Sequence, residues 1–432
     1  MIEIALLAFA VLILLLTLGV PLPYCFGAAL MVMTVIGEAT MRGMMVWGFS
    51  QLTNPVLLAI PLFVFAGTLM SVSGIAGSLL KFVNVFVGRI RGGLGAVAAV
   101  SCAIIGAISG SGLTGIAAIG PLLIPEMERK GYPRAYSTAL IANASILGLL
   151  IPPSVTMIVY GWVTDTSILA SFLATLGPGL LIMFNFCLVN MFMSRRFDLE
   201  LDAPLPFDRL MREAGRRTGH ALPALMMPII ILGGIYGGIM TPTEAAAVAV
   251  IYALPVGFLI YRGLNWRTLL ESGKESATAV GAILIMILFS LMLSQIYVME
   301  SIPQALVDLI FRITDDKFVL LLLVNLLLFF IGMIVNDITA IILTAPLLLP
   351  LMEALGVSSV QFAAIMGVNT AMGGVTPPYA SILYLGSRIG KVRFTEVVKP
   401  AMTLILFGYI PVVVLVSAWP DLSEFLPGLF GY

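Results

Sequence analysis

The chain has 432 residues, of which 60% are hydrophobic and only 10% charged, and its 22 basic and 22 acidic residues cancel. One soluble core cannot bury that much apolar surface, so the composition excludes an ordinary globular protein and indicates one whose solvent is lipid. The zero net charge gives no support to nucleic-acid binding, and the sequence has no G-x-x-x-x-G-K-[ST] motif for ATP hydrolysis at a phosphate-binding loop.

The chain begins with two apolar runs, residues 4–20 and 22–36, and runs of about 20 residues, the length that crosses a bilayer, recur almost to its end. No positive charge precedes the first run, so it predicts a retained membrane helix and not a signal peptide. The single histidine, His220, lies outside the apolar runs, and the three cysteines are far apart. The sequence therefore predicts an all-α polytopic membrane protein without an enzyme active site or a cofactor.

The apolar segment 94–131 starts and ends beside basic residues but is interrupted by Ser109-Gly110-Ser111-Gly112. Such a run breaks a helix near the middle of the membrane, so the segment predicts a re-entrant helical hairpin. The next segment is interrupted between Gly148 and Pro153, because proline lacks the backbone donor and clashes with the preceding turn. It predicts a membrane helix that is broken in the middle.

Residues 195–220 form the longest polar stretch and predict a cytoplasmic linker between two halves of the chain. Thr241 and Glu244 then have the spacing of a capping box, which predicts a helix start and not a functional site. Residues 74–89 and 301–312 are less apolar and each precedes a predicted hairpin, so they predict interfacial arm helices.

The second half repeats the pattern of the first. Segment 318–356 is interrupted at Asn336-Asp337, and the segment after it between Gly373 and Pro378. Five residues of the first half recur 225 positions later: Pro121, Pro125, Met127, Glu128 and Gly131. If the basic loops are cytoplasmic, they hold, together with Lys81, 19 of the 22 Lys and Arg residues, as the positive-inside rule requires. Five membrane crossings then separate the repeated motif at 121–131 from its copy at 346–356. Because five is an odd number, the second copy has the opposite orientation, and we expect two inverted repeats.

Paired interrupted helices in two repeats indicate a transporter's binding site, since irregular backbone inside a membrane must face protein or a water-filled cavity. The carbonyls freed there suit Na⁺, and the N-termini of half-helices suit an anion. The alternative is a set of kinked helices joined by Ser and Asn hydrogen bonds. We favour Asn143 and Asn369, which match across the repeats, as site residues. Asp337 either helps to bind a cation or only caps the half-helix that follows it.

Several stretches together carry a resemblance to a known family. They are Ser109 to Ser111, Asn143 to Ser154, Gly238 to Ala247, Asn336 to Thr339 and Asn369 to Pro378. Over nearly its whole length the chain resembles the large membrane subunit of tripartite ATP-independent periplasmic (TRAP) transporters, the dicarboxylate-permease M subunit. The resemblance implies a multi-pass protein of the bacterial inner membrane that takes up an organic acid, such as sialic acid or a C4-dicarboxylate, together with Na⁺.

The same resemblance implies two partners, a small four-helix membrane subunit and a periplasmic substrate-binding protein. It also implies two sodium sites, each between a hairpin tip and the neighbouring broken helix. The first site is expected at Ser109, Ser111, Asn143, Gly148 and Pro152. The second is expected at Asn336, Asp337, Thr339, Asn369, Gly373 and Thr376. The substrate is expected between the hairpin tips, with Ser111, Ser154, Asn336 and Pro378 as candidates.

An elevator-type division of the chain is a further implication of the resemblance. The transport domain is expected to comprise residues 94–178 and 318–390, which hold the hairpins and broken helices. The scaffold is expected to comprise residues 1–93 with the first arm helix, residues 179–317 with the linker 195–220 and the second arm helix, and the C-terminal helix in residues 391–432.

Other functions fit the sequence less well. A stand-alone cation-coupled organic-anion permease of similar inverted-repeat architecture is the alternative within the same class. An intramembrane serine hydrolase using Ser109 or Ser111 would need a base, and no histidine lies in the apolar runs. An ion channel would need repeated rings of charge, which the sequence lacks.

Overall fold

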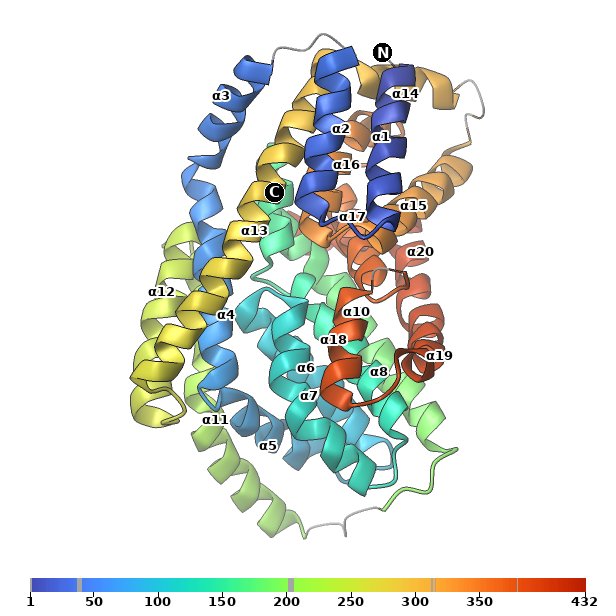
Figure 1. Cartoon of the computed structure of the whole chain (residues 1–432). Coiled ribbons are helices and arrows are strands. Elements are labelled where there is room, and N and C mark those ends of the chain that lie inside the picture. The colour runs from blue at the N-terminus through green and yellow to red at the C-terminus, as the bar shows by residue number, and fades with distance from the viewer. Residues whose placement is uncertain (1, 37–40, 201–205, 312–313, 315, 379) are drawn as a thin grey trace.

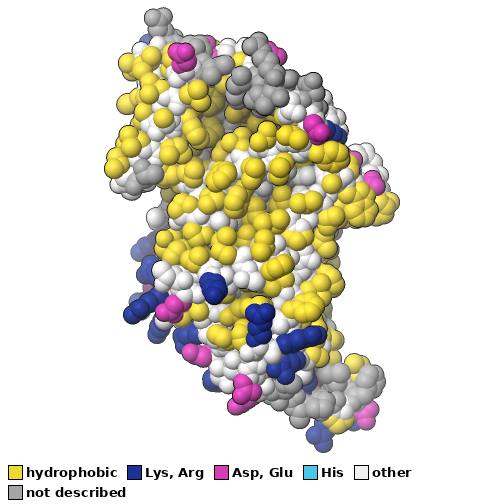
Figure 2. Space-filling model, turned by 90° about the vertical axis from the view of Figure 1, so that its right-hand side faces the viewer, with side chains coloured by type: hydrophobic (Ala, Val, Ile, Leu, Met, Phe, Trp, Pro, Cys, Tyr) yellow, Lys and Arg dark blue, Asp and Glu magenta, His cyan; other side chains and the backbone are white. Residues whose placement is uncertain are grey.

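The computed structural model describes residues 2–36, 41–200, 206–311, 314, 316–378 and 380–432, and every regular element among them is a helix (Figure 1). Eight of these helices have the length and apolar composition needed to cross a membrane. In Figure 2, Lys and Arg side chains gather towards the lower end of the visible face, below a broad band of hydrophobic side chains. The prediction of an all-α polytopic membrane protein is therefore confirmed.

The helices before the polar stretch are α1 (Ile2–Thr17), α2 (Leu22–Ile36), α3 (Met41–Leu52), η1 (Pro55–Leu58), α4 (Ala59–Val72), α5 (Ile75–Val87), α6 (Gly93–Ser109), α7 (Gly112–Arg129), α8 (Arg134–Ser145), η2 (Ile146–Leu149), α9 (Val155–Val163) and α10 (Ile168–Ser194). Those after it are α11 (Phe207–Tyr236), α12 (Pro242–Pro255), η3 (Val256–Ile260), α13 (Trp266–Met299), α14 (Ile302–Phe311), α15 (Lys317–Ile334), α16 (Asp337–Ala354), α17 (Ser359–Gly374), α18 (Ser381–Gly390), α19 (Phe394–Leu404), η4 (Ile405–Tyr409), α20 (Ile410–Ala418) and α21 (Asp421–Leu429). Both predicted hairpin segments and both predicted broken helices are interrupted at the expected residues.

Side-chain caps explain where several helices begin. The hydroxyl of Thr241 accepts a hydrogen bond from the main-chain N–H of Glu244, and the Glu244 carboxylate accepts one from the N–H of Thr241 at 2.7 Å. The predicted capping box is therefore confirmed. Asp316 likewise accepts from the N–H groups of Phe318 and Val319 at the start of α15. These bonds satisfy donors that the first turn of a helix leaves without a partner.

The polar stretch is shorter than predicted. The sequence predicts a linker over 195–220, but α11 already begins at Phe207, so the second half of that stretch is helical. Ion pairs of Glu213 with Arg217, one turn later, and with Arg89 stabilise this polar helix. Helices α5 and α14 form where the arm helices were predicted. Residues 201–205 of the predicted linker and Arg312 of the second predicted arm lie outside the described residues.

The helices pack in two groups. The support bundle consists of α1–α5 and α11–α14, in which α4 lies against α12 and α13, and α5 against α11. The hairpin bundle consists of α6–α10 and α15–α21, in which α8 packs against α6, α7 and α19, and α17 against α10 and α15. The two bundles meet where α5 contacts α6, where α4 contacts α6 and α7, and where α13 and α14 contact α16 (Figure 1).

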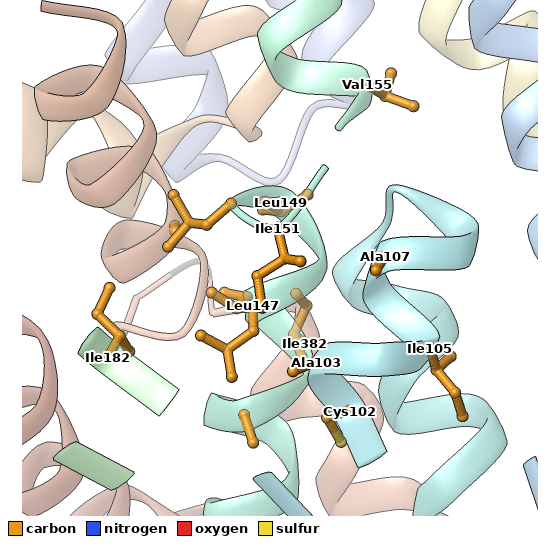
Figure 3. Packing of buried hydrophobic residues seen from close by; sticks show 14 of the residues in the cluster. Cys102, Ala103, Ile105, Ala107, Leu147, Leu149, Ile151, Val155, Ile182 and Ile382 are labelled. Carbon is orange, nitrogen blue, oxygen red and sulfur yellow. The ribbon is translucent and has the colours of Figure 1, made fainter. Parts of the chain in front are cut away.

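The interior of the hairpin bundle is apolar around the first interruption. Figure 3 shows Leu147 and Ile151 of this interruption between Ala103 of α6 and Ile182 of α10. All four side chains belong to one continuous buried cluster. The interrupted backbone is thus covered by apolar side chains on several sides, which leaves the polar atoms at the break with few possible partners.

Candidate functional site

The turn between α6 and α7 is the first hairpin tip. Here α6 ends at Ser109, Gly110 has a left-handed φ of 61°, and Ser111 is extended before α7. Glycine adopts this conformation without strain, which lets the chain reverse at Gly110. Ser109 is fully buried and Ser111 is half-buried, and the Ser109 hydroxyl donates to the main-chain oxygen of Ser111 at 3.4 Å. The tip therefore presents two hydroxyls beside a main-chain oxygen.

The first interruption separates α8 from α9. After the turn η2, residues 151–153 are non-helical and include a cis peptide bond between Pro152 and Pro153. The side chain of Ser154 then caps α9, and its hydroxyl donates to the main-chain oxygen of Leu149. A carbonyl released by the break is thus satisfied by a side chain from the helix that follows.

The first tip and the first interruption touch through glycines. A β-carbon added at Gly148 would lie 2.8 Å from the Cα atom of Gly106 and 3.0 Å from the main-chain oxygen of Ser111. A β-carbon added at Gly110 would lie 2.8 Å from the main-chain oxygen of Pro153. Glycine at these positions therefore lets main-chain oxygens of the tip and of the break share one small volume.

The second hairpin tip lies between α15 and α16. Val335 and Asn336 are extended, and the Asn336 side chain accepts from the N–H of Thr339 at 3.3 Å. The cap of α16 is therefore Asn336 and not Asp337, which is the first residue of the helix and half-buried. Thr339 is 1% exposed, and its hydroxyl has no hydrogen-bond partner among the described residues.

The second interruption follows α17 and resembles the first in its contacts. Residues 375–378 are non-helical and include a cis peptide bond between Pro377 and Pro378. A β-carbon added at Gly373 would lie 2.6 Å from the Cα atom of Gly332 in α15. The hydroxyl of Thr376 is directed back to α17, where it donates to the main-chain oxygen of Met372 at 2.7 Å. Each interruption is thus held against its own hairpin by a pair of glycines.

Asn143 and Asn369 occupy matching positions, each shortly before an interruption. Both are fully buried, and each side-chain amide donates a 2.9 Å hydrogen bond to the carbonyl one turn earlier, that of Ala139 or Ile365. Neither Oδ1 atom has a hydrogen-bond partner within the described part of the chain. A buried acceptor without a partner costs about 1–3 kcal/mol, so either oxygen would gain from a ligand that it could coordinate.

The donor atoms in these two regions limit what that ligand can be. No group of three or more His, Cys, Asp or Glu residues that could hold a metal is found in the described ranges. The regions offer hydroxyl, amide and main-chain oxygens, together with the carboxylate of Asp337. Oxygens of this kind at broken helices suit an alkali cation such as Na⁺, whereas imidazole or thiolate ligands would be needed to favour a transition metal.

Some of the predicted site residues are in contact in the structure, whereas Ser154 serves as a helix cap. Ser111 and Gly148 are in direct contact at the first site, and the contact of Gly332 with Gly373 joins the helices that carry the predicted second site. Among the substrate candidates, Ser111 and Asn336 are half-buried and Pro378 is exposed. The fourth, Ser154, is fully buried and engaged as a helix cap.

Sequence analysis missed Asn325, which accepts a 2.7 Å hydrogen bond from the side-chain amide of Asn369. It lies in α15, outside both predicted interruptions. The sequence could have pointed to Asn325, because it is the one polar residue between Phe318 and Ile331. A lone amide in the middle of an apolar span is expensive to bury and is therefore a functional candidate.

Comparison with protein families gives one match that covers almost the whole chain. Residues 9–422 match the model of the DctM component of the tripartite ATP-independent periplasmic transporters. The match includes every residue predicted for the two sodium sites.

Three named relatives are similar over most of this sequence. The sialic acid TRAP transporter large permease protein SiaM of Vibrio cholerae is 35% identical, over 88% of both chains. The C4-dicarboxylate TRAP transporter large permease protein DctM of Pseudomonas aeruginosa is 33% identical, over 91% of both chains. The isethionate TRAP transporter permease protein DctMQ of Oleidesulfovibrio alaskensis is 32% identical over 96% of this chain, but the match spans only 65% of that longer protein.

A solved structure supports the fold. The YdaH transporter of Alcanivorax borkumensis, whose crystal structure is described as having an unusual topology, superposes with a TM-score of 0.55. The alignment covers 87% of this chain and 89% of that one at 18% sequence identity, so the likeness concerns the fold alone.

Proposed function

Because this chain belongs to the DctM family of tripartite ATP-independent periplasmic transporters, we propose that it couples the inward flow of Na⁺ to the uptake of an organic acid. It is a multi-pass large permease of the bacterial inner membrane and not an enzyme. The observation that carries the proposed coupling is the matched pair of buried, unpartnered amide oxygens on Asn143 and Asn369.

We assign one Na⁺ to each hairpin tip. The first site would use the oxygens of Ser109, Ser111 and Asn143 and the main chain at Gly148 and Pro152. The second would use Asn336, Asp337, Thr339, Asn369, Gly373 and Thr376. The unpartnered Thr339 hydroxyl supports the second assignment, since a cation would supply what this buried oxygen lacks. Asp337 would add the one carboxylate among these ligands.

The two halves are proposed to be inverted repeats with re-entrant hairpins. Support comes from their common order of elements, a hairpin followed by a broken helix, in α6–α9 and in α15–α18. The basic loops indicate which side of the membrane is cytoplasmic. An odd number of membrane crossings between the two halves then gives the second half the opposite orientation in the membrane. The tips then meet near the bilayer centre from opposite sides, the arrangement in which broken helices bind ions and substrate.

The packing supports a moving body that is larger than the transport domain expected from the sequence. Helix α10 packs against α6 and α17, α19 against α8, and α20 against α17. The scaffold expected from the sequence included α19, α20 and the part of α10 from residue 179 onward. We therefore propose that the whole hairpin bundle moves as the transport domain and that the support bundle is the scaffold. The boundary expected at residue 178 then shifts to the α10–α11 connection, and the one expected at residue 390 is lost, while the one at the start of α15 stays in place.

Membrane potential supplies part of the driving force in this mechanism. Each net positive charge that moves inward gains about 2.3 kcal/mol per 100 mV. Binding of Na⁺ would also offset the cost of holding an anion between two tips in a low-dielectric surrounding. An excess of Na⁺ over substrate charge would therefore drive accumulation of the organic acid.

The substrate is proposed to be a small molecule with an acidic group. The relatives described above are named for sialic acid, a C4-dicarboxylate and isethionate, which all carry one or more such groups. The half-helices α9, α16 and α18 begin at the interruptions and the second tip, and the first-turn N–H groups that the Ser154 and Asn336 caps do not use suit an anion. Ser111, Asn336 and Pro378 remain the candidate contacts, since they are accessible at this place.

Two further proteins complete the proposed system. A tripartite transporter of this family includes a periplasmic binding protein and a small membrane subunit. The relative named DctMQ, of which the match spans 65%, is long enough to contain a second membrane component. We propose that in this system the small subunit is a four-helix protein and that the periplasmic protein delivers the substrate.

Uptake into proteoliposomes tests the proposal. Liposomes would contain the permease with its small subunit and receive sialic acid, succinate or isethionate bound to the periplasmic protein, with or without an inward Na⁺ gradient. Uptake that needs all three proteins and Na⁺ supports the proposal. Uptake by the permease alone would instead establish the stand-alone permease, and uptake indifferent to Na⁺ would refute sodium coupling.

A further inference from the structure

A chain of hydrogen bonds leads from Asn369 across the hairpin bundle. The Asn369 amide donates to Oδ1 of Asn325 at 2.7 Å, and the Asn325 amide donates to the Ser417 hydroxyl at 2.9 Å. The Ser417 hydroxyl in turn donates to the main-chain oxygen of Val413 at 2.8 Å. Helices α17, α15 and α20 are thus joined by three side chains that lie in apolar surroundings.

The hydrogen bonds of Asn325 and Asn369 fix which way each side-chain amide is turned. Asn325 also donates to the main-chain oxygen of Leu321 at 2.7 Å, and Asn369 to that of Ile365. Turning either amide over would place its oxygen against a carbonyl oxygen of its own helix, which is repulsive. Both N–H bonds of Asn369 are therefore used, and its Oδ1 is fixed as the free acceptor.

The first half of the chain has no such arrangement. The positions that correspond to Asn325 at offsets of 226 and 225 are Ala99 and Val100, which cannot hydrogen-bond through their side chains. Asn143 has a single side-chain bond among the described residues, the one to Ala139. The two asparagines that match in burial therefore differ in how firmly their amide groups are held.

We propose that Asn325 is a positioning residue of the second sodium site, which orients Asn369 so that its Oδ1 points at the cation. The inference rests on the sodium sites of the proposed function and deepens one of them. A ligand held in its binding orientation loses less conformational freedom when the ion arrives, so the second site binds Na⁺ more tightly than the first. Groups that orient a metal ligand change ion affinity by about 10–100-fold when they are removed.

The test is the Na⁺ dependence of uptake by the reconstituted three-component system. Asn325→Leu removes both amide functions but keeps the branching and the number of heavy atoms of the side chain. It is expected to raise the Na⁺ concentration for half-maximal uptake about tenfold. Asn190→Leu is the matched control. Its amide is also buried and joined to two partners, Gly92 and Tyr136, but at the far end of the hairpin bundle from the tips. It is expected to keep the Na⁺ dependence of the native chain.

A double-variant cycle separates positioning from a general structural role. If Asn325 acts through Asn369, then Asn325→Leu adds nothing to the loss of Na⁺ affinity already caused by Asn369→Leu. Independent, additive losses would overturn the inference, as would a normal Na⁺ dependence in Asn325→Leu. If Asn369→Leu itself leaves the Na⁺ dependence unchanged, the assignment of the second sodium site fails instead.

A milder variant keeps the inference testable if Asn325→Leu does not fold. Ser417→Ala removes one acceptor of the Asn325 amide, together with the bond from Ser417 to Val413 within α20, and leaves Asn325 itself in place. It is expected to raise the half-maximal Na⁺ concentration about threefold. The increase in melting temperature that Na⁺ gives the purified permease provides a second readout without transport. Unchanged Na⁺ dependence of both uptake and melting in Ser417→Ala would count against the inference.

Discussion

The hydroxyl of Tyr409 donates a 3.0 Å hydrogen bond to the main-chain oxygen of Asn143, and both residues are fully buried. Tyr409 lies in the π-helical turn η4 between α19 and α20. Its hydrogen bond therefore joins the C-terminal helices to α8 at Asn143, a proposed ligand of the first sodium site. The bond joins parts of the chain that are 266 positions apart.

Tyr409→Phe is expected to weaken Na⁺ binding at the first site, because α8 loses a contact that fixes the position of Asn143. One hydrogen bond is worth about 1 kcal/mol, which corresponds to about a fivefold rise in the half-maximal Na⁺ concentration for uptake. Tyr252→Phe is the control, since Tyr252 donates a similar 2.8 Å bond to the main-chain oxygen of Pro223 within the support bundle. Equal effects of the two variants would contradict the prediction.

Asn143→Ala and Asn369→Ala are each expected to raise the half-maximal Na⁺ concentration about tenfold or more, because each removes a proposed cation ligand. The steepness of the Na⁺ dependence should also fall, since only one ion then binds in the useful range. Uptake measured over a series of Na⁺ concentrations checks both effects. A change in maximal rate alone, at unaltered Na⁺ dependence, would show that the two amides serve only to join helices.

Gly373→Ala is expected to impair transport strongly, because the new β-carbon would lie 2.6 Å from the Cα atom of Gly332. Backbone must then move, at a cost of about 1–3 kcal/mol, and the second tip separates from the interruption. Gly374→Ala is the control, since its nearest neighbour is the end of the Ile146 side chain at 3.2 Å, which can shift. Uptake rates and melting temperatures should separate the two variants, and equal tolerance would speak against a close tip contact.

Replacing Na⁺ by K⁺ or choline is expected to lower the melting temperature of the purified permease. A ligand present at 100 times its dissociation constant stabilises the folded state by about 2.7 kcal/mol. The shift should disappear in the Asn143→Ala/Asn369→Ala double variant, which lacks one ligand of each proposed site. A shift that survives in the double variant would mean that Na⁺ acts elsewhere or through ionic strength.

The interruptions could be predicted because their causes are local. Glycines and serines at 109–112, the Asn336-Asp337 pair and the two Pro-Pro pairs break a helix whatever surrounds them. The role of Asn325 could not be predicted, because its partners Asn369 and Ser417 are 44 and 92 positions away. The grouping of α19 and α20 with the hairpins likewise depends on packing between distant helices, which periodicity does not contain.

The first tip also depends on a residue that is made much later. A β-carbon added at Gly112 would lie 2.7 Å from the Cδ1 atom of Ile382 in α18, so the tip closes against a helix about 270 residues downstream. At about 5–20 residues per second, a ribosome reaches α18 roughly 15–50 s after the tip has been made. During that time the nascent tip lacks its contact with α18. Completion of the proposed first cation site is therefore a late event in the biogenesis of this permease.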